Sequence, residues 1–308
     1  MGKMIFKLLI CALVCCELNA GEPTRTPIAE GITSKIFDAE KKPDKSRYHL
    51  FSPTPGELMR DMSTDRPDKT ESPYSVDAGH FQFETDLFAY TADRRNPEHD
   101  GTRVKSYSVL PVNVKMGLTN RIDLQLVMET YTSEKTRARN AAGEAFEETL
   151  QGFGDITSRL KINVWGNDGG MTALAFMPFV KIPTNQENLG NDAVEGGLIV
   201  PLAVELPRGW GMGVMTEFDL NRDEDDRGYH VEFINTLTFS HDIYGDLGGY
   251  VEFFSSVSAE PRTRWVGTVD MGLTYAVTKD IQMDAGVNIG VTRSADDVNP
   301  FVGLSWRF

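Results

Sequence analysis

Apolar and polar side chains alternate along most of this chain, in segments of about ten residues. Ile281, Met283 and Ile289 occupy alternate positions of one such segment, and Asp284 and Asn288 lie between them. Successive side chains of a β-strand point to opposite faces, so each segment would have one apolar face and one polar face. A tilted membrane-spanning strand needs about 9–11 residues, which is the length of these segments. The pattern predicts about twelve strands, near residues 79–91, 104–117, 121–132, 153–165, 171–182, 196–206, 210–220, 229–241, 246–256, 265–277, 281–291 and 301–308.

The connections between these strands alternate in length. Short turns are expected at residues 118–120, 166–170, 207–209, 242–245 and 278–280. Longer and mostly charged loops are expected at residues 92–103, 133–152, 183–195, 221–228, 257–264 and 292–300. Barrels of the bacterial outer membrane have short periplasmic turns and long external loops, and their first strand pairs with the last because unpaired backbone groups are costly in lipid.

We therefore predict an all-β fold, a single up-and-down antiparallel transmembrane β-barrel of about twelve strands. The barrel would occupy residues 78–308 and lie in the outer membrane, with lipid around it. Val302, Leu304, Trp306 and Phe308 share one face of the last segment. This pattern is typical of the strand that closes such a barrel, and we expect it to serve as the signal read by the barrel-assembly machinery.

The N-terminus has the features of an export signal. Lys3 and Lys7 precede an apolar run, and a small-residue cleavage site ends at Ala20, so residues 1–20 are predicted to be a signal peptide. All three cysteines lie within it, so the mature chain would have neither disulfides nor cysteine-ligated metals. The formal net charge of −14 argues against nucleic acid as a partner.

Residues 21–77 form an irregular extension that is rich in proline and charge, which rules out a long helix or strand. One interpretation is a flexible periplasmic tail. The other is that its second half enters the barrel as a plug, with Asp65, Arg66, Asp68 and Lys69 packed against a polar lumen wall.

Charged side chains on the faces opposite the apolar stripes are expected to line the lumen. The candidates for a solute path are Glu84, Asp123, Glu129, Arg159, Lys161, Glu217, Glu232, Glu252, Asp270 and Asp284. Their acidic bias favours cations or neutral solutes over anions. The alternative is that these charges form cross-strand pairs that brace a closed barrel.

Catalytic chemistry has little support in the sequence. Ser240 and His241 point to opposite faces of a predicted strand, and no other serine and histidine form a convincing pair. His230 and Glu232 share a face, but two ligands without a third do not define a metal site. We expect no catalytic residues, no metal and no cofactor, and a membrane-embedded hydrolase is only a remote alternative.

Three stretches carry a resemblance to a known family. They are residues 63–74 with 76–84, the Gly152-Phe153-Gly154-Asp155 element, and the strand end at residues 179–184. Together they resemble the outer-membrane transporter family named after the MetA pathway of phenol degradation, over roughly residues 60–308. The resemblance implies a barrel associated with the uptake of hydrophobic or aromatic compounds.

The sequence thus predicts an outer-membrane channel for the passive uptake of small hydrophobic or aromatic solutes. The alternative is a closed structural or adhesive barrel that acts through its long external loops, above all residues 133–152.

Overall fold

The computed structural model describes residues 44–94, 96–97, 102–139, 144–186, 189–190, 192–223 and 228–308. The predicted signal peptide and the start of the extension lie outside these residues. Short 3₁₀ turns in the described residues include η1 (Gly56–Leu58) and η3 (Pro207–Gly209). The strands are β1 (Phe81–Arg94), β2 (Arg103–Ser108), β3 (Val112–Thr119), β4 (Ile122–Met128), β5 (Thr132–Arg139), β6 (Ala145–Gly152), β7 (Ile156–Trp165), β8 (Thr172–Ile182), β9 (Glu195–Leu206), β10 (Trp210–Arg222), β11 (Tyr229–Tyr244), β12 (Leu247–Ser258), β13 (Val266–Thr278), β14 (Ile281–Gly290) and β15 (Val298–Arg307).

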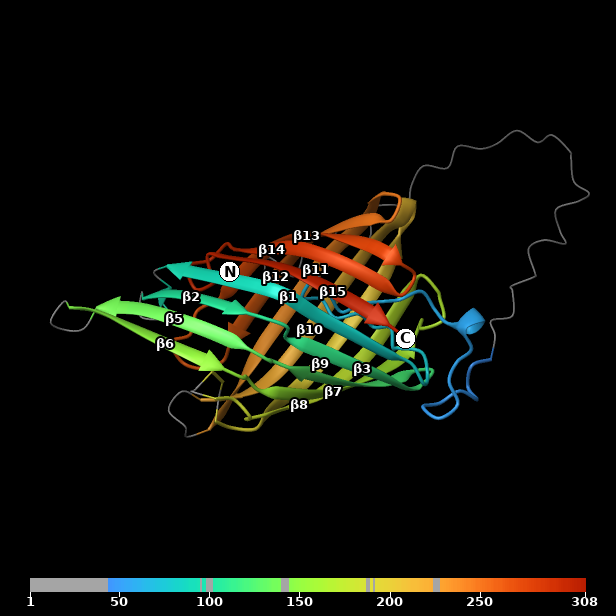
Figure 1. The fold of residues 1–308 in the computed structure, drawn as a ribbon, viewed down its shortest axis with the longest axis horizontal. Helices are drawn as coiled ribbons and strands as arrows, with labels where there is room; N and C mark the ends of the chain where they lie inside the picture. The colour runs from blue at the N-terminus through green and yellow to red at the C-terminus, as the bar shows by residue number, and fades with distance from the viewer. Residues whose placement is uncertain are drawn as a thin grey trace, which may run out of the picture. The chain divides into compact units, whose positions relative to one another are not determined.

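Twelve of these strands form a closed antiparallel barrel (Figure 1), which confirms the predicted fold class. The ring runs through β1, β3, β4 and β7 to β15, and β15 pairs with β1 to close it. At the closure, the backbone N–H groups of Phe81 and Phe308 each donate to the carbonyl of the other residue at 3.0 Å. The hydrogen bonding between the two ends of the barrel therefore extends one residue past β15, to Phe308.

Apolar side chains cover the outside of the barrel. On β13, the outward-facing Met271, Leu273 and Tyr275 are 40–50% exposed, whereas Asp270 on the inner face is completely buried. At the end of β15, Trp306 is exposed and Arg307 is buried, and Phe308, which follows the strand, is exposed. This distribution places the apolar face of each strand toward lipid and its polar face toward the lumen. No helix in the described part of the chain is long and apolar enough to cross a membrane.

One end of the barrel carries only short connections, and both β1 and β15 have their closure ends there. We call it the short-turn end, and the opposite end the long-loop end. Aromatic side chains that the sequence places near short turns are exposed in the structure, among them Trp165, Trp210, Tyr275 and Phe308. Such rings are typical of a membrane interface.

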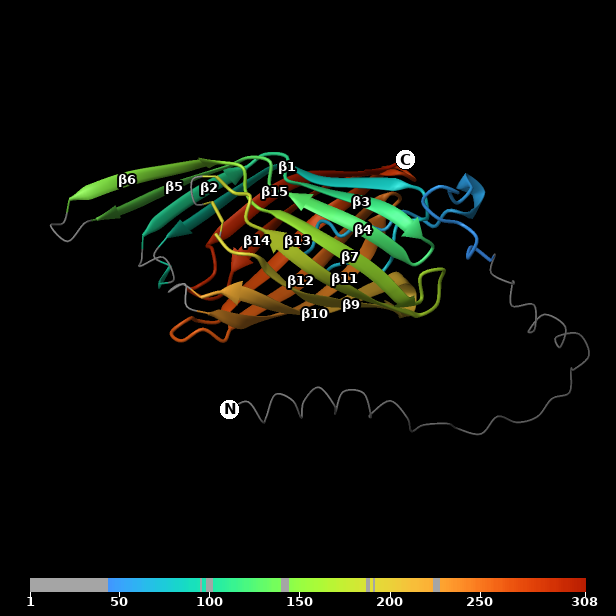
Figure 2. The same ribbon diagram turned by 90° about the horizontal axis from the view of Figure 1, so that it is seen from below.

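The described residues of the expected loop, 133–139 and 144–152, are mostly strand, which corrects the prediction from the sequence. They form most of the hairpin of β5 and β6, which pairs with β2 and projects beyond the barrel at the long-loop end (Figures 1 and 2). Exposed charges made this segment resemble a loop. Side chains on both faces of β6 are largely exposed, so no apolar stripe marks this strand.

The same projection divides two predicted strands. The segment at 104–117 is split into β2 and β3, and the segment at 121–132 ends at β4 with β5 beyond it. Leu110, at the first break, has a φ of 56° and donates its N–H to the carbonyl of Asp86. Thr130, at the second break, donates its hydroxyl to the carbonyls of Val109 and Leu110 at 2.8 Å. The two breaks lie side by side, so β2 and β5 leave the barrel wall at the same height along the barrel.

The described part of the extension begins outside the barrel at the short-turn end and then runs inside it (Figure 2). Gly117 on β3 lets it pass closely, because a Cβ there would lie 2.1 Å from the carbonyl oxygen of Asp77. Residues 60–77, which we call the lumen segment, make polar contacts with inward-facing residues of the barrel wall, with residues of the short turns and with one another.

Candidate functional site

Asp65 of the lumen segment lies between two buried lysines of the barrel wall. Its carboxylate contacts Lys115 on β3 and lies 2.6 Å from Nζ of Lys161 on β7. Lys115 also contacts Glu84 on β1, and Glu84 in turn accepts the backbone N–H of Asp65 at 3.0 Å. These side chains are almost fully buried. A buried charge is tolerated when it is paired and hydrogen-bonded, and this cluster meets that condition.

Arg66 extends the other way around the wall, toward β1 and β14. Its guanidinium lies 2.8 Å from Asp284 on β14 and 2.7 Å from Asp86 on β1. Gly303 on β15 leaves room for it, because a Cβ there would lie 2.0 Å from the guanidinium. The glycine is therefore needed for close approach between strand and segment.

Lys69 and Thr70 contact the wall at β12 and β13. Lys69 places its Nζ 3.1 Å from Asp270 on β13 and 4.3 Å from the ring centroid of Phe254. The hydroxyl of Thr70 lies within 2.6 Å of a carboxylate oxygen of Glu252 on β12. Together with Asp65 and Arg66, these contacts join the segment to strands around most of the barrel's circumference.

The last contact of this set is between Glu71 and Arg159 on β7. A carboxylate oxygen of Glu71 lies 2.5 Å from the guanidinium of Arg159. The backbone N–H of Glu71 points to the sulfur of Met215 on β10 at 3.4 Å. The segment thus contacts both a charged and an apolar part of the wall at this residue.

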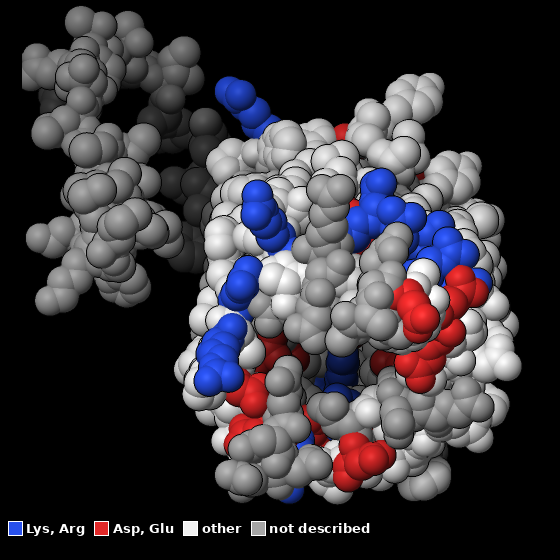
Figure 3. Space-filling view, turned by 90° about the vertical axis from the view of Figure 1, so that its left-hand side faces the viewer, with Lys and Arg blue, Asp and Glu red and all other residues white. Residues whose placement is uncertain are grey.

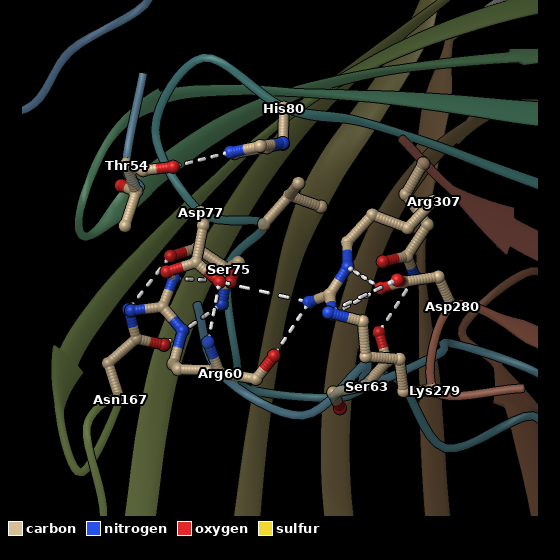
Figure 4. A network of polar contacts seen from close by, with 12 residues as sticks. Thr54, Arg60, Ser63, Ser75, Asp77, His80, Asn167, Lys279, Asp280 and Arg307 are labelled. Atoms are coloured by element: carbon tan, nitrogen blue, oxygen red, sulfur yellow. Dashed lines mark hydrogen bonds and ion pairs between the residues drawn. The ribbon is translucent and has the colours of Figure 1, made fainter. Parts of the chain in front are cut away.

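A second network holds the segment at the short-turn end (Figure 4). The carboxylate of Asp77 accepts the backbone N–H of Arg60 at 3.0 Å, and the guanidinium groups of Arg60 and Arg307 lie 3.3 and 3.8 Å from it. Arg307 also donates to the carbonyl of Arg60 at 2.9 Å and lies 2.7 Å from Asp280 in the β13–β14 turn. The two ends of the segment are therefore fixed to each other and to the last strand.

Asp168, in the β7–β8 turn, extends this network. Its carboxylate lies 2.9 Å from Nζ of Lys45 and 3.1 Å from Arg60, and it accepts the side-chain amide of Asn120 at 2.7 Å. Partial burial alone would raise the pKa of Asp168. The hydrogen bonds from Asn120 and Lys45 and the charge of Arg60 nevertheless hold that pKa below its usual value.

Of the ten residues predicted to line a solute path, seven contact the lumen segment. They are Glu84, Asp123, Arg159, Lys161, Glu252, Asp270 and Asp284. Most of their partners belong to the segment rather than to neighbouring strands. All of Asp65, Arg66 and Lys69 pair with the wall, and Asp68 lines a cavity described below.

The other three predicted residues lie nearer the long-loop end. Glu129 packs against Gly154, whose Cβ position would lie 2.1 Å from its carboxylate. Glu232 accepts the side-chain amide of Asn221 at 2.8 Å. Glu217 lies two residues along β10 from Met215 and opposite Ile199 of β9. Figure 3 looks into this end and shows acidic side chains around a recess with basic side chains inside it.

An apolar cluster interrupts this polar inner wall. Met177 on β8, Ile199 on β9 and Met215 on β10 are at most 2% exposed, and Phe179 and Ile234 pack against them. We call these five residues the apolar strip. Methionine side chains are flexible and polarizable, so they fill irregular gaps in a buried cluster such as this one.

A cavity of about 630 Å³ lies between the lumen segment and the wall at the short-turn end. Its lining combines polar groups with aromatic and apolar ones, including Arg66, Pro67, Leu206, Trp210, Tyr250 and Gln282. The hydroxyl of Tyr250 donates to the carbonyl of Pro67 at 3.3 Å, which joins the two sides of the cavity.

Sequence analysis missed the network around Asp77. Arg60, Asp77 and Asp168 lie in stretches without alternation, so the sequence contains no pattern that pairs them across distances of 17 and 108 residues. The apolar strip was also missed. Its residues lie on strands in which both faces are partly apolar, so the polar inner face is hard to recognise.

Comparison with known proteins identifies the family. A family model described as "Putative MetA-pathway of phenol degradation" matches residues 64–308. The chain belongs to this family. The resemblance noted in the sequence is thereby confirmed. The closed barrel with its apolar outer face is that of an outer-membrane protein.

One of the similar solved structures supports the fold. The COG4313 outer membrane channel from Pseudomonas putida F1 is 13% identical, with a TM-score of 0.53 over 80% of this chain and 100% of that chain. The NanC porin (10% identity, TM-score 0.47, covering 73% of this chain and 98% of that one) and the TodX monoaromatic hydrocarbon channel (9%, 0.42, 74% and 90%) are also matched. No curated protein matches the sequence.

Proposed function

We propose that this protein is an outer-membrane channel for the passive uptake of small hydrophobic or aromatic compounds. The observation that carries the proposal is the apolar strip on the inner wall, since a path meant only for hydrophilic solutes has no use for five clustered apolar side chains. Membership of the phenol-degradation family agrees with this class of solute.

Within this proposal, the lumen segment is a plug. Its ion pairs with strands on several sides of the barrel fix it across the lumen, and the Asp77 network anchors both of its ends. A plug held in this way blocks a wide aqueous path. The cavity beside the segment remains as a space that a small ring-shaped solute can occupy. The apolar strip is buried in this structure, and it lines the path of the solute only where the side chains that cover it move aside.

The charges of the wall have a different role from the one a pore would give them. Paired with the segment, Glu252, Asp270 and Asp284 position the plug and are not free to select ions. Glu217 and Glu232, which lie nearer the long-loop end, are the acidic groups we expect an incoming solute to meet.

The test is uptake of a radiolabelled monoaromatic hydrocarbon by cells that express the protein. Met215→Gln places a polar group in the apolar strip, and we expect it to slow uptake. Met171→Gln is the matched control, because Met171 is 70% exposed in the β7–β8 turn, away from the strip. Equal uptake by the wild type, Met215→Gln and cells without the protein would overturn the proposal.

The projecting hairpin of β5 and β6 favours one other role, adhesion through the long-loop end. Thr132 and Gly152 are paired, so residues 133–151 can be replaced by a short glycine linker without separating their neighbours. Loss of surface binding with unchanged uptake would assign adhesion to the hairpin. Unchanged surface binding would remove the adhesive alternative.

A further inference from the structure

Three metal-ligating side chains converge at the rim of the long-loop end. They are Asp223, just after β10, His230 on β11, and Glu260, in the loop after β12. Nδ1 of His230 lies 3.0 Å from Oδ1 of Asp223 and 3.7 Å from Oε2 of Glu260. One ligand atom from each residue lies within 4.8 Å of the others.

These separations suit a bound transition metal. With metal–ligand bonds of about 2.1 Å, the ligand atoms of a tetrahedral site lie about 3.4 Å apart. The two measured distances fall on either side of this value, so small side-chain movements would complete the geometry. Two carboxylates and a neutral imidazole also supply the negative charge that a divalent cation needs.

Local structure fixes each ligand in place. The backbone N–H of Asp223 donates to the carbonyl of Gly228 at 3.1 Å, which closes the β10–β11 hairpin. His230 is paired with Asn221 in the β10–β11 ladder. Ligands on an ordered frame need little further ordering to bind.

Glu260 is equally well placed. Its backbone N–H donates to the hydroxyl of Ser258 at 3.0 Å, and its carbonyl accepts the hydroxyl of Thr263 at 2.7 Å. The neighbouring Ala259 N–H donates to the carbonyl of Val231 on β11 at 2.8 Å. The loop that carries Glu260 is therefore joined directly to the strand that carries His230.

The side chains are partly shielded from solvent. Their exposed fractions are 25% for Asp223, 13% for His230 and 15% for Glu260. One face of the group thus remains open for water or another ligand to complete the coordination.

The sequence had suggested a different partner for His230. Glu232 lies on the same face of β11, but it accepts hydrogen bonds from Asn221 and Ser256 instead. The ligand partners come from two other segments, 7 and 30 positions away in the sequence, so the spacing of ligands along the chain gives no signal for this site.

We infer that Asp223, His230 and Glu260 form a binding site for a divalent transition-metal ion, of which Zn²⁺ is the best fit. The ion joins the β10–β11 hairpin to the loop after β12 at the outer rim of the barrel. The site is independent of the solute that the channel carries.

Zinc titration of the purified protein, taken from the outer membrane into detergent, tests the site by calorimetry. We expect saturable binding of one Zn²⁺ and a higher unfolding temperature in its presence, because an ion that binds only the folded state stabilises it. The absence of saturable binding by the wild type would overturn the inference.

The decisive variant is His230→Arg, which keeps a cation between the two carboxylates but cannot bind a metal. It should fold normally, as judged by circular dichroism, and lose the zinc-dependent rise in unfolding temperature. His241→Ala is the control, because His241 lies at the other end of β11 and bonds to backbone carbonyls.

Retention of wild-type zinc affinity by His230→Arg would refute the site. X-ray absorption at the zinc edge supplies a second readout. The site requires nitrogen and oxygen ligands with an imidazole contribution, and a shell of sulfur ligands would contradict it.

Discussion

Two additions distinguish this barrel from a bare twelve-stranded ring, and they are stabilised in opposite ways. The lumen segment has no regular secondary structure and depends on buried ion pairs such as Asp65 with Lys161. The projection of β2, β5 and β6 depends on backbone ladders, and its ion pairs, such as Arg137 with Glu147, are exposed. Ion pairs between the same kinds of residue therefore contribute differently to the free energy of unfolding in the two regions.

Solvent accounts for the difference. An exposed ion pair is screened by water, so its net contribution is about 0–1 kcal/mol. A buried pair that loses one partner leaves a charge without water or a counter-ion, at a cost of about 3–5 kcal/mol. Removing charges should therefore disturb the lumen segment strongly and the projection only slightly.

Asp65→Asn should have the largest effect. It leaves Lys161 without its carboxylate partner and Lys115 with only Glu84, so we expect a loss of about 3 kcal/mol in the free energy of unfolding. Denaturant titration of the protein in lipid vesicles measures it. Asp297→Asn, which breaks the exposed pair with Arg94, is the matched control. Equal effects of the two changes would mean that the two regions do not differ as described.

Gly303→Leu should have the second-largest effect. The new side chain occupies the space of the Arg66 guanidinium and forces it away from Asp284 and Asp86. Overpacking of this kind costs about 1–3 kcal/mol. We expect a raised ion current in planar bilayers as the segment moves. Gly56→Leu, where no atom lies within 4 Å of the added Cβ, should leave the current unchanged.

The Asp168 contacts should show a smaller, pH-dependent effect. Because the pKa of Asp168 is lowered in the folded protein, its contribution is present above the ordinary value of 3.8 and is lost as the pH falls through the lowered one. Asp168→Asn should therefore cost less than about 1 kcal/mol at neutral pH and nothing in strong acid. Unfolding titrations of both proteins across this range check the sign, and a difference that grows on acidification would contradict it.

Glu147→Gln should have the smallest effect. It removes the exposed pairs with Lys135 and Arg137 on β5, while the β5–β6 ladder remains. We expect a change below about 0.5 kcal/mol, measured in the same unfolding titration. A loss comparable to that of Asp65→Asn would show that charge, and not the ladder, holds the projection together.

The difference between these regions also explains what the sequence could predict. Alternation predicted the ring and its closing strand, because a strand between lipid and lumen must have one apolar face, as in Met271 and Leu273 beside Asp270. The projection has no lipid-facing side, so β6 carries no such pattern and its sequence is typical of a loop.

The site was predicted only in part. Inward-facing charges such as Asp284 followed from the period of two, and Arg66 was a candidate plug residue. Their pairing joins positions 218 residues apart, and it depends on a closed ring that only the folded chain provides.

The most direct test of the plug is the single-channel conductance of a variant in which residues 61–74 are replaced by a short glycine–serine linker. Arg60 donates to the carbonyl of Ser75 at 2.9 Å, so the linker can leave the Asp77 network intact. The account predicts a small conductance for the wild type and a several-fold larger one for the variant. Equal conductance in the two proteins would contradict the claim that the lumen segment closes the barrel.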